Sequence, residues 1–315
     1  MERLNHCGAA IQSFRKAQAR GDFYTHGEDT AVSWLIDCLN GAVKFILPTV
    51  KGDSSLIESI DVTRALELVR LPYPEVAIEY RVEGDLSKGE TPCPKRISLC
   101  FSPRSIRLFG IDIPPRSDSD GVYVMSIFEV SSDRWFVVPV LAFLATTGPF
   151  CMAPPGLLSH QRGGKGISLD LYRLPFKKMW SCYLEGRRSP QEILDLVKAD
   201  LSDEVQIAAA FCVAMSCSNV REEVVVRSEG VNRRREIKGK RPLYEYRILT
   251  VDFDSVKGAR GGQVAESGRA SPRQHLRRGH VRRVGERIVW VNPAVVGSHG
   301  RIDKDYVVKG GNNAT

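Results

Sequence analysis

The sequence predicts an α+β protein with N-terminal helices, a middle antiparallel sheet, and a C-terminal unit that combines helix with a small sheet. Apolar residues recur at three- and four-residue spacings near the start, and between residues 72 and 147 their period is nearer two. Helical spacing returns after residue 189. With 315 residues, 43% of them hydrophobic, the chain can bury a sizeable core, and its length favours two domains.

The first 48 residues are expected to be mainly helical. Residues 31–39 place apolar side chains at helical spacings before Gly41, and residues 43–47 add a short apolar stretch before Pro48.

Five strands are expected next, at residues 75–80, 96–100, 105–109, 122–129 and 134–138. Consecutive strands at this spacing favour an antiparallel sheet, and the break at residues 131–133 predicts a hairpin turn. The most apolar run, residues 135–145, is far shorter than the roughly 20 residues that span a bilayer and contains Pro139, so we interpret it as a core strand.

Residues 148–188 are rich in glycine and proline and are expected to connect two domains, 1–147 and a basic α+β domain at 189–315. The Gly163-Gly164-Lys165-Gly166 run lacks the serine or threonine that ends a phosphate-binding P-loop. Ser189 is expected to cap a helix through a capping box with Glu192, and a turn signal at residues 201–203 suggests that another helix starts there.

Beyond this helical region, residues 223–226 indicate a strand or a helix exit, and residues 232–242 are polar enough to indicate an exposed basic loop. Strands are expected at residues 243–251, 287–291 and 304–308, which would form a small C-terminal sheet.

The positive charge is concentrated in the C-terminal third. The net charge is +8, but residues 227–287 hold 17 Lys or Arg against 7 Asp or Glu, so the rest of the chain is slightly acidic. A local excess of this kind attracts polyanions and accelerates their encounter with the protein. The alternative interpretation is a solvated loop that keeps the protein soluble.

Two of the six histidines lie among five arginines in residues 271–283. In a metal-independent ribonuclease, His275 and His280 would be the base on the ribose 2′-hydroxyl and the acid on the leaving oxygen. Arg278 or Arg277 would stabilise the charge of the phosphorane. The five-residue separation puts the two histidines on opposite faces of a flat strand, so this mechanism requires a bend at Gly279.

Metal and cofactor sites are not expected. His275 and His280 have the spacing of the second half of a zinc finger, but no Cys-x-x-Cys pair accompanies them. His280, Asn292 and His299 follow the order of an HNH-type nuclease without its surrounding framework. The eight cysteines have no paired spacing, and no secretory signal follows Met1, so we expect free thiols in a reducing cytosol.

Several motifs resemble a family of uncharacterised phage and prophage proteins. They are Cys217-Ser218-Asn219-Val220, a segment from Asn232 through Arg235, Gly239-Lys240, Pro242-Leu243 and Tyr246, His275-x-Arg277-Arg278-Gly279-His280, Trp290-Val291-Asn292, and Val295-Val296-Gly297. The resemblance covers roughly residues 205–308, with a weaker echo at residues 71–80. It implies a phage protein in the cytosol of a bacterial host, and the family has no established activity.

The leading hypothesis is a module that binds nucleic acid, RNA or DNA, through its phosphate backbone, with no membrane partner. Tyr244, Tyr246 or Trp290 would stack on bases. The residues expected to contact phosphate are Arg233, Arg234, Arg235, Lys238, Lys240 and Arg241 in one patch, and Arg277, Arg278, Arg282 and Arg283 in another.

Three alternatives remain open: the ribonuclease, an inhibitor that binds an acidic host protein, and a purely structural cluster. In the structural cluster the histidines would donate hydrogen bonds to loop backbone, and the arginines would pair with carboxylates such as Asp303 and Asp305.

Overall fold

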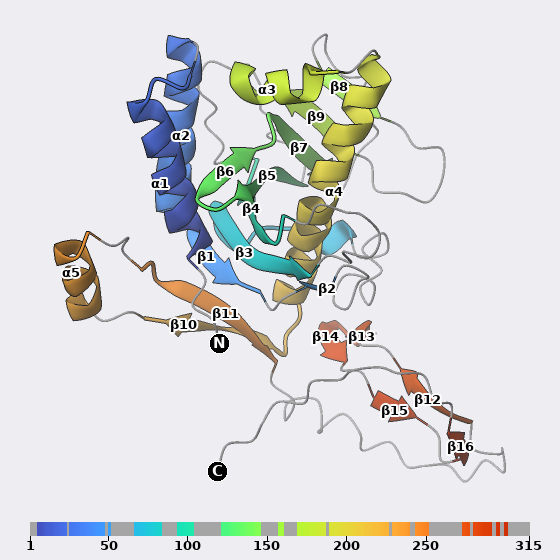
Figure 1. Ribbon diagram of the computed structural model, residues 1–315. Helices are drawn as coiled ribbons and strands as arrows, with labels where there is room; N and C mark the ends of the chain where they lie inside the picture. The colour runs from blue at the N-terminus through green and yellow to red at the C-terminus, as the bar shows by residue number, and fades with distance from the viewer. Residues whose placement is uncertain are drawn as a thin grey trace.

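The computed structural model has the expected α+β class, with helices at the N-terminus and a large mixed sheet at the centre (Figure 1). It describes residues 5–23, 25–47, 50–51, 66–83, 93–103, 121–145, 157–160, 169–186, 189–226, 229–239, 243–251, 273–277, 280–291, 294–296 and 299–301. The helices are α1 (His6–Ala19), α2 (His26–Gly41), α3 (Lys177–Leu184), α4 (Pro190–Met215) and α5 (Glu229–Ile237), with a short 3-10 helix at Leu66–Leu68.

The large sheet has eleven strands, of which nine follow the order β10-β11-β1-β3-β4-β5-β7-β9-β8, while β2 pairs with β3 and β6 with β5. Their bounds are β1 (Val43–Ile46), β2 (Val50–Lys51), β3 (Glu75–Glu83), β4 (Lys95–Phe101), β5 (Gly121–Ser131), β6 (Arg134–Val137), β7 (Val140–Ala145), β8 (Leu157–His160), β9 (Leu169–Arg173), β10 (Val220–Val225) and β11 (Tyr246–Val251). There are two small sheets among the described residues. One contains β12 (Arg273–Arg277), β15 (Ala294–Val296) and β16 (His299–Arg301). The other contains β13 (His280–Val284) and β14 (Arg287–Val291).

The sheet is mixed where the sequence predicted only antiparallel pairing. β1 runs parallel to both of its neighbours, β3 and β11, so it is joined to them by crossover connections and not by hairpins. β11 was expected in a small C-terminal sheet, but it completes the large one beside β1, and β10 forms the edge. The expected strands at 75–80, 96–100 and 122–129 are present as parts of β3, β4 and β5.

Helices cover both faces of the sheet (Figure 1). The side chains of β3 alternate between two cores: Val76, Ile78 and Tyr80 join the core beneath α4, and Ala77 joins the core beneath α1 and α2. Because both faces are covered, the central strands are apolar along nearly their whole length.

The helix expected at Ser189 is capped as predicted, since the Ser189 hydroxyl accepts a hydrogen bond from the backbone N–H of Glu192. The expectation of a second helix start near residue 202 is wrong, because α4 runs unbroken for 26 residues. Ser202 donates its hydroxyl back to the carbonyl of Ala199 at 3.0 Å instead of capping a new helix. Apolar side chains on both sides of this point, such as Leu201 and Val205, pack in one core.

The predicted hairpin turn lies between β5 and β6, where Asp133 adopts a positive φ of 61°. The apolar run 135–145 is not a single strand, since Pro139 separates β6 from β7.

The Gly/Pro-rich stretch 148–188 was expected to be a connection, yet it contributes β8, β9 and α3. β9 pairs with β7, and its Leu171 and Tyr172 are buried. The expected basic loop at 232–242 is also wrong in its first half, which belongs to α5, because arginine and glutamate favour helix even where the segment has no apolar face. The expected strands at 105–109 and 304–308 and the Gly163–Gly166 run lie outside the described residues. The division into two domains stays a prediction.

A fully buried carboxylate, Glu79 on β3, joins α1 to the sheet. It accepts hydrogen bonds from the backbone N–H groups of His6 and Cys7 at the first turn of α1, both at 2.8 Å. The Tyr246 hydroxyl of β11 lies 3.2 Å from Glu79 Oε1 and 3.1 Å from Asn5 Oδ1. Burial raises the pKa of Glu79, and the N–H donors of Cys7 and His6 oppose that rise.

The imidazole of His6 is buried and packs on Trp135, with the ring centroids 5.8 Å apart. Burial, followed by the positive charges of Arg81 and Lys95, lowers the pKa of His6 from 6.5 to about 3. The folded protein therefore holds His6 uncharged. The contribution of uncharged His6 to the free energy of unfolding is complete above pH 6.5 and is lost as the pH falls from 6.5 toward 3.

We predict that His6→Leu reduces the acid sensitivity of folding. Between pH 6.5 and pH 5, the free energy of unfolding should fall by about 1.5 kcal/mol more in the wild type than in the variant. Urea unfolding at a series of pH values measures this difference. His26→Leu, at an exposed position at the start of α2, is the matched control. Equal pH slopes for wild type and His6→Leu would show that His6 is not held uncharged.

Candidate nucleic-acid interface

The β13–β14 hairpin presents one basic face outward. Arg282 pairs with Val289 and Val284 with Arg287 across the two strands, so these four side chains share one face of the hairpin. The opposite face carries Val281 and Trp290, which pack against the core beneath α4. Arg282 and Arg287 are exposed and make no hydrogen bond or ion pair with a described residue.

The turn of the hairpin is two residues long, and Gly285 adopts the positive φ of 61° that such a turn requires. Arg283 lies on the inner face and pairs with Glu67 at 3.1 Å. Both side chains remain about two-thirds exposed, so this pair adds little to stability.

An asparagine clamps the hairpin to the C-terminal end of α4. Asn219 Nδ2 donates to the carbonyl of Trp290 at 2.9 Å, and the Trp290 N–H donates to Asn219 Oδ1 at 2.7 Å. Next to it, the N–H of Ser218 donates to the carbonyl of Ile288 at 2.8 Å. Asn219 is almost fully buried, so the clamp fixes the hairpin at the start of β10.

A second basic surface lies on α5, at the other end of β10 (Figure 1). Arg233, Arg234 and Lys238 are exposed there, and they make no hydrogen bond or ion pair with a side chain that the structure describes, whereas Arg235 is half-buried and engaged in a contact. The helix ends at Ile237, and two residues later Gly239 adopts a positive φ of 60°. Lys240 and Arg241, predicted members of the same patch, lie outside the described residues.

α5 is held by the same kind of clamp as the hairpin. Asn232 Nδ2 donates to the carbonyl of Leu243, and the Leu243 N–H donates to Asn232 Oδ1, both at 2.8 Å. The helix is thereby tied to the segment that leads into β11. Two asparagines thus hold the two basic surfaces toward opposite ends of β10, a strand of six residues that is about 20 Å long.

The residues predicted for ribonuclease chemistry are distributed over two sheets. His275 and Arg277 belong to β12, which pairs with β15 and β16, whereas His280 begins β13, which pairs with β14. Arg278 and the predicted bend at Gly279 lie outside the described residues. The catalytic assignment of these residues stays a prediction.

The aromatic residues predicted to stack on bases have other environments. Tyr246 is fully buried beside Glu79, so that assignment is wrong for this residue. Tyr244 directs its hydroxyl to Asn40 Oδ1 at 2.8 Å, and its ring lies 4.3 Å from the buried ammonium of Lys44. The Trp290 ring is half-buried against the core, which leaves only part of it accessible.

Three residues in the motifs that carry the phage-family resemblance are structural: Asn219 and Asn232 are clamps, and Tyr246 lies beside the buried carboxylate. These roles were not predicted from the sequence. Asn219 offered a signal, because it stands directly before a strand, where a side-chain amide can replace backbone partners.

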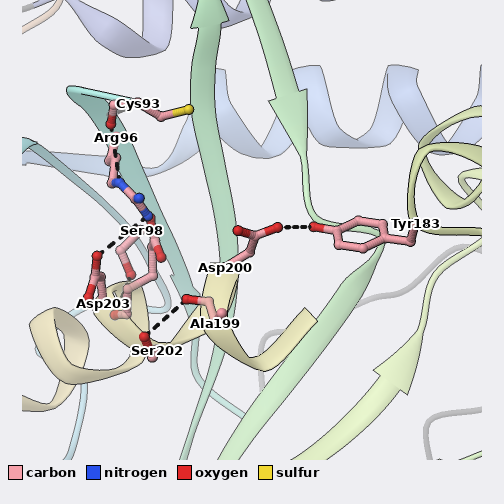
Figure 2. A network of polar contacts seen from close by, with 9 residues as sticks. Cys93, Arg96, Ser98, Tyr183, Ala199, Asp200, Ser202 and Asp203 are labelled. Atoms are coloured by element: carbon pink, nitrogen blue, oxygen red, sulfur yellow. Dashed lines mark hydrogen bonds and ion pairs between the residues drawn. The ribbon is translucent and has the colours of Figure 1, made fainter. Parts of the chain in front are cut away.

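A polar network away from the basic surfaces links α4 to β4 (Figure 2). Arg96 donates to Glu204 Oε1 at 3.1 Å and lies 3.7 Å from Asp203. The Ser98 hydroxyl donates to the carbonyl of Glu204 at 3.0 Å. Glu204 is fully buried, and this burial raises the pKa of its carboxyl while the charge of Arg96 opposes the rise.

Further buried polar groups lie between α4 and this face of the sheet: the Tyr80 and Ser126 hydroxyls and Glu204 Oε2. Close by, the Tyr183 hydroxyl donates to Asp200 at 2.6 Å (Figure 2). The network is enclosed between helix and sheet, which suits a structural role. Within the described residues, no three His, Cys, Asp or Glu side chains are grouped so that they could hold a metal ion. None of the described helices is long and apolar enough to cross a membrane.

We predict that Arg96→Met lowers the free energy of unfolding by about 3 kcal/mol at pH 7, because it leaves the buried Glu204 without its cation. The double variant Arg96→Met/Glu204→Met should be clearly more stable than the single variant, since no buried charge remains. Chemical denaturation of both variants measures the difference. A double variant no more stable than Arg96→Met would show that the ion pair is not the source of the loss.

We predict that Asn219→Ala releases the hairpin and lowers the free energy of unfolding by about 1–3 kcal/mol, because two hydrogen bonds to backbone are lost. Release would expose the Trp290 ring and shift tryptophan emission to longer wavelength. Asn232→Ala is the matched control, since it cuts the equivalent clamp at α5, far along the chain from Trp290. An unchanged emission maximum in Asn219→Ala would contradict the clamp.

Models of protein families, curated proteins and solved structures contain no match to this chain. The resemblance to phage and prophage proteins therefore stays a prediction from the motif residues.

Proposed function

We propose that this protein binds nucleic acid by its phosphate backbone, through the exposed cations of α5 and of the outer face of the β13–β14 hairpin. The observation that supports this most directly is that Arg233, Arg234, Lys238, Arg282 and Arg287 are exposed and have no ionic partner among the described residues. Residues 229–239 hold four cations against two carboxylates, and residues 280–291 hold three against one.

Arginine suits this role because its planar guanidinium donates paired hydrogen bonds to a phosphate. Fixed cations of this kind bind any sequence, and they release counterions from the nucleic acid when they do so. The clamps at Asn219 and Asn232 hold both surfaces on ordered elements, which reduces the entropy lost on binding. The setting we propose is the cytosol of a bacterial host, where a phage protein would meet both RNA and DNA.

We predict that affinity for nucleic acid falls steeply with salt and depends on both surfaces. Fluorescence anisotropy with labelled 20-nucleotide RNA and DNA, single-stranded and duplex, at 50 and 200 mM salt measures this dependence. Arg282→Glu/Arg287→Glu and Arg233→Glu/Arg234→Glu should each weaken binding on the order of tenfold or more at 50 mM salt and reduce the salt slope. The matched control, Arg134→Glu/Lys177→Glu, reverses the same number of exposed charges elsewhere and should have a smaller effect.

Two outcomes would reject the proposal: no binding to any of the four substrates at 50 mM salt, or equal losses in the control and the surface variants. The same samples, incubated in EDTA and run on denaturing gels beside His275→Ala, report RNA cleavage separately. Cleavage that disappears in His275→Ala would identify the ribonuclease alternative.

A further inference from the structure

The strand β10 forms one edge of the eleven-stranded sheet, and its outer side has no strand partner among the described residues. It is six residues long and contains no proline or lysine, two of the features that block pairing at sheet edges. Val224 is 42% exposed, and Val226 just beyond the strand is 70% exposed. Such an edge can accept another strand.

We propose that β10 pairs antiparallel with β10 of a second copy of this chain, so that the protein forms a twofold-symmetric dimer with a sheet continuous across both copies. The proposal concerns the free protein and does not depend on nucleic-acid binding. A second copy is the expected partner because, in one antiparallel register, the charges along β10 are complementary to those of another β10.

Symmetry restricts the register of this pairing. An edge-to-edge antiparallel pair has its twofold axis perpendicular to the sheet, so side chains that face each other come from the same face of the two sheets. The axis must then pass through the midpoint between a residue and its own copy. If the register shifted by one residue, each side chain would lie opposite a side chain that points to the other face of the sheet.

Among these registers, the one centred on Glu222 matches charge best. It places Arg221 opposite Glu223 of the second copy twice, once on each side of the axis, and Val220 opposite the exposed Val224. Centring on Arg221 or on Glu223 would place like charges opposite each other without these two Arg–Glu pairs. Arg221 already takes part in an interaction within its own chain, and a guanidinium with five N–H donors can also serve a second carboxylate.

The central position, Glu222, would face its own copy, but its charge is already compensated within each subunit. Its Oε1 accepts a hydrogen bond from the Tyr73 hydroxyl at 2.6 Å and pairs with Arg247 at 2.6 Å. Arg247 also lies over the Tyr73 ring, 4.8 Å from its centroid. The two glutamates can therefore lie across the axis without bringing two unpaired charges together.

The antiparallel arrangement has a consequence for the basic surfaces. The hairpin is clamped at the start of β10 and α5 follows its end, so pairing places the hairpin of each copy beside α5 of the other. At each end of the paired strands, the cations of one copy's hairpin would then lie near the cations of the other copy's α5. If the proposed function is correct, a polyanion would span both copies.

Sedimentation velocity of nuclease-treated full-length protein, from 1 to 100 µM, tests the pairing. The wild type should reach twice the 35.1 kDa mass of the chain. Arg221→Glu and Glu223→Arg should each raise the dimer dissociation constant on the order of tenfold, because each places like charges opposite each other at two positions. The double variant Arg221→Glu/Glu223→Arg should restore it, since the charges are exchanged and complementary again.

Glu185→Arg, an exposed charge reversal at the end of α3 and away from β10, is the matched control and should leave the dimer intact. Far-UV circular dichroism and thermal unfolding of every variant separate loss of dimer from loss of fold. The proposal is overturned by a wild type that stays monomeric at 100 µM, as would happen if another segment of the chain covered β10. It is equally overturned by a dimer that the single reversals leave unchanged or that the double variant does not restore.

Discussion

The packing of the N-terminal helices and of β11 on the sheet depends on the burial of one carboxylate, Glu79, against the N-terminus of α1. A buried negative charge is costly unless donors surround it, and the first turn of a helix supplies N–H groups and a positive dipole end. The Tyr246 hydroxyl adds a third contact from β11. One side chain thereby joins the start of the chain, the middle of β3, and a strand 167 residues farther along.

The basic surfaces are connected to this contact through β11. β11 is placed beside β1 at the point where Tyr246 meets Glu79, and β10 pairs with β11 in a defined register. Asn219 then fixes the hairpin at the start of β10, and Asn232 fixes α5 to the segment that leads into β11. In both clamps a side-chain amide bonds the N–H and the carbonyl of a single residue, as a neighbouring strand would. Side-chain amides can therefore hold short elements that lack an apolar face of their own.

Local patterns predicted local structure well, and long-range pairing poorly. The alternation in β3, β4 and β5, the Ser189 cap and the turn at Asp133 all depend on residues within one or two turns of each other. The parallel pairing of β1 with β11 joins Phe45 to Arg247, and nothing within either segment encodes that contact. The continuity of α4 past Ser202 likewise depends on a core that the helix shares with the sheet. For this reason the number and boundaries of elements were partly predictable, but the strand order was not.

The candidate site shows the same limit. Counting charges located the basic regions, but it could not tell which arginines point outward, because that depends on the hairpin register. Pairing through the turn at Gly285 separates Arg282, on the outer face, from Arg283, which lies beside Glu67 on the inner face. The same alternation buries Trp290 in part, so the hairpin presents cations rather than an aromatic platform. A surface of this composition is suited to contacts with phosphate more than to stacking on bases, and such contacts favour binding without sequence preference.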